Sequence, residues 1–379
     1  MFLYQKTNQY FAQLADDLKE LGIAELLELQ ARSIRSVFRG VYFEADQAVL
    51  YRINYHSRLL TRVLAPLIHF PCHSTNYLYK TAMNLDWAKL FSPEHTFAIF
   101  ANISNSKIRH SQYAALCLKD AIVDWFKEHC NQRPSISRHE PDVWISLHIE
   151  NDRAVISLDT SGGSLHRRGY RRQTVEAPMQ ETVAAAIIKL TEWDGQKPLY
   201  DPVAGSGTLL IEALMSYCRI PAGYLRSDFG FKFLPDFDQG LWRSIKQASD
   251  RHIRPLPAGL ICGSDLFPQA VKACRANLAC LPYGDQVHMK AIDFKKIDSL
   301  ENQVIVCNPP YGIRLGSPED MAFFYKELGD FFKQRCKGSS AFVYFGDRSL
   351  IPHIGLKPSW KKPISNGGLD GRLVKFEMY

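Results

Sequence analysis

The second half of the chain alternates short apolar runs with helical patterns, and this alternation limits the possible folds more than any other feature. Apolar residues recur at helical spacing in some segments and fill short continuous runs in others. The expected helices cover 181–191, 208–217 and 268–279, and the strand-like runs between them cover 198–203 and 259–265. Strands and helices that alternate in this way build a parallel sheet with helices on both faces. We therefore predict a doubly wound α/β domain from about residue 176 onward.

The first 160 residues show a different pattern, with shorter helical and strand-like segments in mixed order. Apolar residues at intervals of three and four predict helices over 10–30 and 111–127. The segments 143–151 and 153–161 alternate apolar and polar residues as strands do, and the Asn-Asp dipeptide between them suits a hairpin turn. We expect an α+β region ahead of the α/β domain.

The composition narrows the class of protein but not its partner. The net charge of +7 is compatible with a polyanionic partner, although it is too small to be the signature of a basic tail. Nine cysteines without a CxxC pair favour reduced thiols over a metal site or a disulfide scaffold. The polar N-terminal residues do not suit a secretory signal, and no apolar run of about 18 residues occurs. We expect a soluble, cytoplasmic protein without a bound metal; the oligomeric state stays open.

A glycine-rich turn follows the run at 198–203 and predicts a ligand site. Gly205 and Gly207 let the backbone pass close to a ligand, and the turn presents amide N–H groups where the helix begins, near Thr208. The GxGxxG spacing of dinucleotide-binding proteins is not met, and Asp201 just before the turn is unfavourable beside a pyrophosphate. This acid suits a ligand that carries an amine and a sulfonium. The alternative is an ordinary strand–turn–helix corner.

Two more acidic residues follow predicted strands, Asp265 and Asp293. A carboxylate at a second-strand end commonly accepts hydrogen bonds from ribose hydroxyls, although Asp265 would also cap the next helix. Asp293 can accept from the exocyclic amino group of an adenine, or be a solvated turn residue. Together with Asp201, the two acids favour a ligand with a nucleoside part. The stretch before Asp265 is long for one crossover, so we expect an insertion around 221–238, beside the site.

Asn308-Pro309-Pro310-Tyr311 is the most specific motif of the chain. It follows a buried-strand run at 304–307, so Asn308 lies at the carboxyl end of a strand, where open α/β sheets bind ligands. An exocyclic aromatic amine is a poor nucleophile because its lone pair is delocalised into the ring. The Asn308 side-chain oxygen and the Pro309 carbonyl can accept its two hydrogens and aim the lone pair, and Tyr311 can stack on the base. The motif predicts methyl transfer to such an amine; the alternative is an asparagine that caps a Pro-Pro turn.

The motifs from Asp201 to Tyr311 together resemble those of class I amino-methyltransferases. Four further segments resemble the THUMP-domain RNA methyltransferases, at 104–126, 159–171, 177–188 and 366–377. The closest likeness is to the bacterial group that forms N2-methylguanine in large-subunit (23S) ribosomal RNA. The resemblance covers nearly the whole chain, and several of its motifs are long.

The resemblance implies a Rossmann-like class I methyltransferase domain over 176–379, with a seven-stranded, mostly parallel sheet. It also implies a ferredoxin-like region over 1–60 and an RNA-binding THUMP domain over 61–160. Between them and the methyltransferase domain, 161–175 has the composition of a basic linker. Some members of the family carry a second methyltransferase domain; this chain ends after one, and no second activity is expected.

The resemblance further implies S-adenosylmethionine as the cofactor. Asp201 and the glycine turn would frame its methionine part, Asp265 its ribose and Asp293 its adenine. The expected cofactor-binding set is Asp201, Pro202, Ala204, Gly205, Gly207, Thr208, Asp265, Leu266, Asp293, Phe294 and Asn308. The expected catalytic set is Asn308, Pro309, Pro310 and Tyr311. The Asp-Leu-Phe sequence at 265–267 departs from the commoner family pattern, which leaves the details of the ribose contact open.

Basic residues near the predicted domain junction indicate where RNA would bind. Residues 161–173 hold three glycines and four arginines without an acid, and two more cations precede the predicted helix at 111–127. Guanidinium groups bind phosphates through paired hydrogen bonds and stack on bases. We expect RNA contacts from Lys107, Arg109, Arg167, Arg168, Arg171 and Arg172. The alternative is a solvated linker whose charge serves solubility.

The sequence therefore predicts methyl transfer from S-adenosylmethionine to guanine N2 in structured RNA, with ribosomal RNA expected and transfer RNA as a second option. Adenine N6 methylation of DNA or RNA stays open, because Asn-Pro-Pro-Tyr suits either base. A nicotinamide-dependent oxidoreductase would need a glycine spacing that the turn lacks. A non-catalytic RNA-binding protein is disfavoured because every expected motif position is filled.

Overall fold

The computed structural model of the protein describes residues 1–173, 179–310 and 318–379. The chain forms two compact units: unit 1 comprises Met1–Leu165 and Arg226–Gln247, and unit 2 comprises His166–Leu225 and Ala248–Tyr379. The chain therefore passes between the units three times. In the described ranges, no helix combines the length and the apolar character needed to cross a membrane.

Unit 2 is built on a seven-stranded sheet of the order β10-β9-β8-β11-β12-β14-β13. Its strands are β8 (Leu199–Asp201), β9 (Ile261–Asp265), β10 (His288–Ala291), β11 (Val304–Cys307), β12 (Ser340–Phe345), β13 (Trp360–Pro363) and β14 (Arg372–Glu377). Neighbouring strands from β10 to β12 run parallel, whereas β14 pairs antiparallel with β12 and β13. This sheet confirms the predicted seven-stranded, mostly parallel architecture.

Helices occupy the connections between the parallel strands of unit 2, as the alternation in the sequence predicts. They are α7 (Thr208–Tyr217), α9 (Pro268–Leu278) and α10 (Pro318–Arg335), whereas α6 (Glu181–Leu190) precedes the first strand, β8. The side chains of α7 are buried from its first residue through Met215, so this helix lies in the core. Because β8, β9 and β11 run parallel, their carboxyl ends meet at one edge of the sheet, at Asp201, Asp265 and Cys307.

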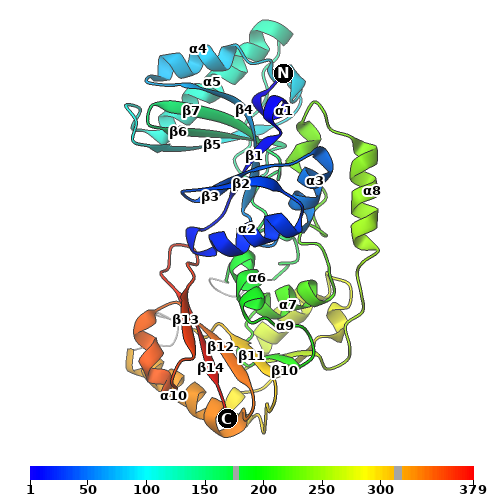
Figure 1. The fold of residues 1–379 in the computed structure, drawn as a ribbon, viewed down its shortest axis with the longest axis vertical. Coiled ribbons are helices and arrows are strands. Elements are labelled where there is room, and N and C mark those ends of the chain that lie inside the picture. The colour runs from blue at the N-terminus through cyan, green and yellow to red at the C-terminus, as the bar shows by residue number, and fades with distance from the viewer. Residues whose placement is uncertain (174–178, 311–317) are drawn as a thin grey trace. The chain divides into compact units, whose positions relative to one another are not determined.

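Unit 1 is built on a second seven-stranded sheet, of the order β2-β3-β1-β4-β7-β6-β5. Its elements are α1 (Leu3–Thr7), β1 (Gln9–Gln13), α2 (Lys19–Glu28), β2 (Arg32–Val37), β3 (Gly40–Glu44), α3 (Gln47–His56), β4 (Arg62–Pro71), α4 (Thr75–Met83), β5 (Phe97–Ser104), α5 (Ser111–Cys130), β6 (Val143–Glu150) and β7 (Arg153–Asp159). Helices α4 and α5 lie on one side of β5, β6 and β7 (Figure 1). The predicted hairpin is confirmed: Asn151 and Asp152 have φ of 49° and 55°, as a primed turn requires.

The helix predicted over 10–30 is wrong in its first half. Residues Gln9–Gln13 form strand β1, and helix α2 begins only at Lys19. Strand β1 pairs with β3 on one side and β4 on the other, and its side chains alternate between half-buried and buried, with Tyr10 and Ala12 in the core. Helical spacing over this range thus arose from a strand followed by a helix, because spacing alone does not separate two short neighbouring elements.

The expected insertion is present, and none of its residues is among those that line the cavity described below. Arg226–Gln247 belongs to unit 1, whose core its aromatic side chains join. The ring centroids of Phe231 and Tyr51 lie 4.5 Å apart, and those of Trp242 and Tyr55 lie 5.3 Å apart. Buried aromatic rings contribute large apolar areas, which explains why this segment packs with unit 1. Helix α8 (Gln239–Asp250) begins within the insertion.

Truncation of Phe231 tests whether the insertion completes the core of unit 1. Phe231 is 1% exposed, so Phe231→Ala should lower the free energy of unfolding by about 3–5 kcal/mol, because it leaves a cavity among the rings. Phe38→Ala makes the same change at a side chain that is 77% exposed and should alter stability by no more than about 0.5 kcal/mol. Urea unfolding of both variants measures the difference. Equal midpoints would show that the insertion is not part of this core.

Candidate active site

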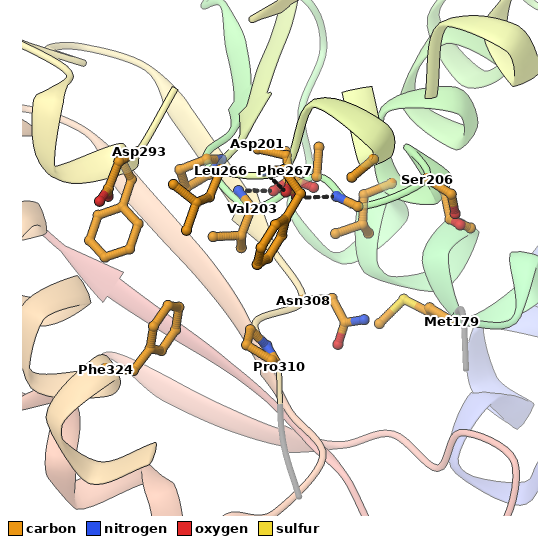
Figure 2. A pocket seen from close by; sticks show the side chains of 18 of the residues that line it. Met179, Asp201, Val203, Ser206, Leu266, Phe267, Asp293, Asn308, Pro310 and Phe324 are labelled. Atoms are coloured by element: carbon orange, nitrogen blue, oxygen red, sulfur yellow. Dashed lines mark hydrogen bonds between the residues drawn. The ribbon is translucent and has the colours of Figure 1, made fainter. Parts of the chain in front are cut away.

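A cavity of about 450 Å³ lies at the edge of the unit 2 sheet where β8, β9 and β11 end (Figure 2). From the predicted cofactor and catalytic sets, it is lined by Asp201, Pro202, Ala204, Gly205, Thr208, Asp265, Leu266, Asp293, Phe294, Asn308 and Pro310. Gly207 and Pro309 are not among the lining residues, and Tyr311 lies outside the described residues. The residues that sequence reasoning missed are Met179, Val203, Ser206, Leu209, Phe267, Ala270, Lys295, Phe324 and Glu327.

Two carboxylates hold the glycine turn in shape. Val203 N donates to Asp201 Oδ1 at 3.0 Å, and Gly205 N donates to Asp265 Oδ2 at 2.8 Å. The other oxygen of Asp265 accepts from Phe267 N at 2.9 Å. Asp265 therefore ties the turn after β8 to the turn after β9.

Gly207 has a packing role. Its φ of 86° lies in the left-handed region, and a Cβ atom at this position would collide with Cys274 Sγ in α9. Only glycine lets α7 begin this close to α9. Gly207 therefore shapes the turn that lines the cavity without facing the cavity itself.

Asp201 is the most deeply buried acid of the cavity. Burial raises the pKa of its carboxyl well above the usual range, the hydrogen bond from Val203 N opposes this rise, and the nearby charge of Asp265 adds to it. Within the described residues, no cationic side chain offsets the effect. A positively charged ligand group beside Asp201 would stabilise the carboxylate. The predicted amine and sulfonium fit this requirement.

One end of the cavity combines charged groups with two aromatic rings. Asp293 Oδ1 accepts from Lys295 N at 3.0 Å, and Lys295 Nζ lies 3.0 Å from Glu327 Oε1 and 3.9 Å from Asp293 Oδ2. The rings of Phe294 and Phe324 meet edge to face with centroids 5.7 Å apart. Figure 2 shows Asp293 and Phe324 together at this end. An acceptor beside apolar rings suits a flat heterocycle that carries an amino group.

The other end of the cavity carries an unsatisfied acceptor. Asn308 follows β11 directly, and Figure 2 shows its side chain beside Met179. Its Oδ1 atom is buried and has no hydrogen-bond partner among the described residues. A buried acceptor without a donor costs about 1–3 kcal/mol, so such an atom marks a place where a ligand donor is expected. The Tyr325 hydroxyl donates to the Pro310 carbonyl at 3.4 Å, which helps to fix the backbone after Asn308.

None of the six basic residues predicted to contact RNA lines the cavity. The exposed ones are Lys107, Arg109, Arg167 and Arg172. Arg168, in contrast, is 1% exposed, and its Nε lies 3.4 Å from Glu212 Oε1. Arg171 is half-buried, and its Nη2 lies 3.1 Å from Glu181 Oε1. Because both guanidinium groups are engaged within unit 2, we no longer expect Arg168 and Arg171 to contact RNA.

Three parts of the chain match known protein families. Residues 168–375 match the RMKL-like methyltransferase domain, 72–159 match the THUMP domain, and 9–64 match the RlmL ferredoxin-like domain. The methyltransferase match alone covers more than half of the 379 residues. The resemblance found in the sequence motifs is thereby confirmed.

Two known proteins are similar over nearly the whole chain. A Synechocystis protein, provisionally named as an RNA methyltransferase, is 39% identical over 374 residues, which are 98% of this chain and 97% of the relative. The ribosomal RNA large subunit methyltransferase K/L of Photobacterium profundum is 35% identical over 369 residues, which are 96% of this chain. The chain spans only about half of that K/L protein, 52% of its length.

Two crystal structures share the fold over 98% of this chain. A protein described as a methyltransferase, in complex with SAH, superposes with a TM-score of 0.85 at 28% identity and is itself covered to 98%. A predicted N6-adenine-specific DNA methylase from Listeria monocytogenes superposes with a TM-score of 0.83 at 25% identity and is covered to 96%. SAH is what remains of S-adenosylmethionine after methyl transfer, and S-adenosylmethionine is the cofactor of this domain. The chain therefore belongs to the RMKL-like methyltransferase family, with a THUMP domain and an RlmL ferredoxin-like domain ahead of its methyltransferase domain.

Proposed function

We propose that this methyltransferase transfers a methyl group from S-adenosylmethionine to the exocyclic N2 of a guanine in structured RNA, with large-subunit ribosomal RNA as its substrate. The observation that carries the proposal is the buried Asn308 Oδ1, an acceptor without a partner among the described residues, in the wall of the cavity. RNA as the polymer is supported by the THUMP match and by the names of the relatives. Guanine N2 is supported by the family that the sequence motifs resemble.

The cavity suggests how the cofactor is held. Asp265 would accept from the ribose hydroxyls and Asp293 from the adenine amino group, while Asp201 and the glycine turn would face the charged methionine part. The other proposed cofactor contacts are Pro202, Ala204, Gly205, Thr208, Leu266 and Phe294. The bound cofactor supplies an electrophilic methyl group carried on a sulfonium.

Asn308 would act on the target base by positioning its amine. The Asn308 Oδ1 atom and the Pro309 carbonyl would accept the two amine hydrogens, which draws the nitrogen lone pair out of the ring and aims it at the methyl group. Because Oδ1 is buried, water does not compete for this hydrogen bond. Tyr311, outside the described residues, would stack on the base. The proton can leave to solvent after transfer, so no strong base is required.

RNA would bind through exposed basic residues outside the cavity. The proposed RNA contacts are Lys107, Arg109, Arg167 and Arg172. The loop that carries Lys107 is fixed, because Lys107 N and the Ser106 hydroxyl both donate to Asp152 Oδ1 at 2.8 Å. In the first turn of α5, Tyr113 is 61% exposed and offers a ring to an unpaired base. A fixed loop with two cations and a nearby ring suits contacts with phosphates and bases.

Nucleoside mass spectrometry of ribosomal RNA tests the proposed product. A strain that lacks the protein should lose an N2-methylguanine from 23S ribosomal RNA, and the intact gene should restore it. Loss of an N6-methyladenine from RNA or DNA would instead identify adenine as the target base. The name of the Listeria structure favours this alternative. Unchanged modification of ribosomal RNA, transfer RNA and DNA would contradict the proposed activity and leave a role in RNA binding.

Removal of the Asn308 side chain should affect the chemical step far more than cofactor binding. Asn308→Ala should lower kcat by about 10²–10³-fold, the usual effect of losing one preorganised hydrogen-bonding group. The exposed Asn76→Ala serves as the matched control and should retain wild-type rates. Transfer of labelled methyl groups to RNA measures kcat, and calorimetry measures the Kd of SAH. A kcat of Asn308→Ala near that of Asn76→Ala would refute the catalytic assignment.

Charge reversal at Lys107 and Arg109 tests the proposed RNA surface. The double variant Lys107→Glu/Arg109→Glu should weaken RNA binding and reduce the slope of log Kd against log salt by about 2, because two phosphate contacts are lost. Lys272→Glu/Lys337→Glu makes the same change in net charge at exposed positions of unit 2. Filter binding at several salt concentrations separates the two variants. Equal effects would mean that net charge, rather than local contact, governs the affinity.

A further inference from the structure

The segment that carries the chain from unit 1 into unit 2, residues 166–173, is bonded to the start of the cofactor-binding half. We call it the connecting segment. Its composition predicts a basic linker that contacts RNA, yet Arg168 and Tyr170 are buried. The Tyr170 hydroxyl donates to Glu212 Oε1 at 3.2 Å, and Arg168 Nε lies 3.4 Å from the same oxygen. Glu212 belongs to α7, the helix that begins at the glycine turn.

Arg171 bonds the connecting segment to two walls of the cavity. Its Nη1 donates to Ser206 Oγ at 3.4 Å, and its Nη2 donates to Thr208 Oγ1 at 3.4 Å. Nη2 also donates to the Met179 carbonyl at 3.2 Å, and Nε donates to Glu181 Oε1 at 3.1 Å. Ser206, Thr208 and Met179 all line the cavity. One guanidinium therefore joins the glycine turn to the residues that begin α6.

Asn277 completes this connection from α9. Its Oδ1 accepts from Arg172 N at 2.8 Å and from Gln173 N at 3.0 Å. Its Nδ2 donates to the carbonyls of Gln173 at 2.9 Å and Ser206 at 3.1 Å. Because Asn277 is buried, water does not compete for these bonds. Ser206 is thus held at its hydroxyl by Arg171 and at its carbonyl by Asn277.

We propose that Arg171 and Asn277 are positioning residues that hold the glycine turn in the shape that binds S-adenosylmethionine, so that cofactor affinity depends on the connecting segment. Neither residue lines the cavity. The turn contains Gly205 and Gly207, both with positive φ, and glycines lose more backbone freedom than other residues when they are ordered. Bonds that fix the turn beforehand lower the entropic cost of binding. The proposal requires only that the domain binds S-adenosylmethionine, and it does not depend on guanine as the target base or on RNA as the substrate.

A matched pair of arginine variants tests the proposal. Arg171→Lys keeps a positive charge beside Glu181 but cannot reach both hydroxyls, so the Kd of SAH should rise about tenfold, the effect of losing roughly one net hydrogen bond. Arg251→Lys makes the same change at an exposed position of unit 2 and should leave the Kd of SAH within about twofold of wild type. At saturating S-adenosylmethionine, Arg171→Lys should keep nearly the wild-type kcat and show its defect in KM, a separation that a general folding defect would not produce.

Asn277→Ala should also raise the Kd of SAH, and the Tm of this variant is measured on the same samples. If Asn277→Ala does not fold, Arg171→Lys decides alone. An unchanged Kd of SAH in folded Arg171→Lys would overturn the proposal. Weaker RNA binding of Arg171→Lys with unchanged SAH binding would also overturn the proposal, because it would identify the Arg171 guanidinium as an RNA contact. Failure of the proposed function would look different: wild-type protein would bind SAH but methylate no RNA, and the comparison of SAH affinities would still hold.

Discussion

The buried carboxylate of Glu212 determines how the connecting segment packs within unit 2. Helix α7 is buried along most of its length, and Glu212 within it is fully buried. A buried carboxylate is costly unless other groups bond to it. Arg168 and Tyr170 do so; burial and then the charge of Glu212 raise the pKa of Tyr170, which keeps its hydroxyl protonated and able to donate. The connecting segment must therefore lie against α7, and this contact places Arg171 beside the glycine turn.

The polar groups of the cavity differ in what they bond to within the chain. Asp201 and Asp265 accept from backbone amides of the turns that follow their strands, so these acids shape the cofactor side of the cavity. Asn308 Oδ1 has no such partner among the described residues, so it keeps its bonding capacity for a ligand. The acids fix the part of the cavity that would hold the cofactor, and Asn308 Oδ1 is available to a second ligand. This arrangement suits a reaction whose rate depends on the relative placement of two reactants.

The parts of the site that the sequence predicts are those in which the signal is local. Strand β8, the glycine turn and α7 follow one another directly, and Asn308 stands between a buried run and two prolines. Met179 and Phe324 reach the cavity from separate elements, and no spacing in the sequence marks them. The sequence likewise does not predict which arginines of the connecting segment are buried. By residue type Arg168 and Arg172 are equivalent, yet one is buried against Glu212 in a distant helix and the other is exposed, so long-range partners decide their roles.

The three passages of the chain between the units have a consequence for how the protein is made and how its gene can recombine. Residues 1–165 leave the ribosome first, but rings that complete their aromatic core, such as Phe231 and Trp242, belong to the later insertion Arg226–Gln247. Unit 1 therefore cannot finish folding until α6 and α7 of unit 2 have already been synthesised. The gene segments for the two units are likewise discontinuous, so a single crossover between related genes cannot exchange one unit without also exchanging part of the other.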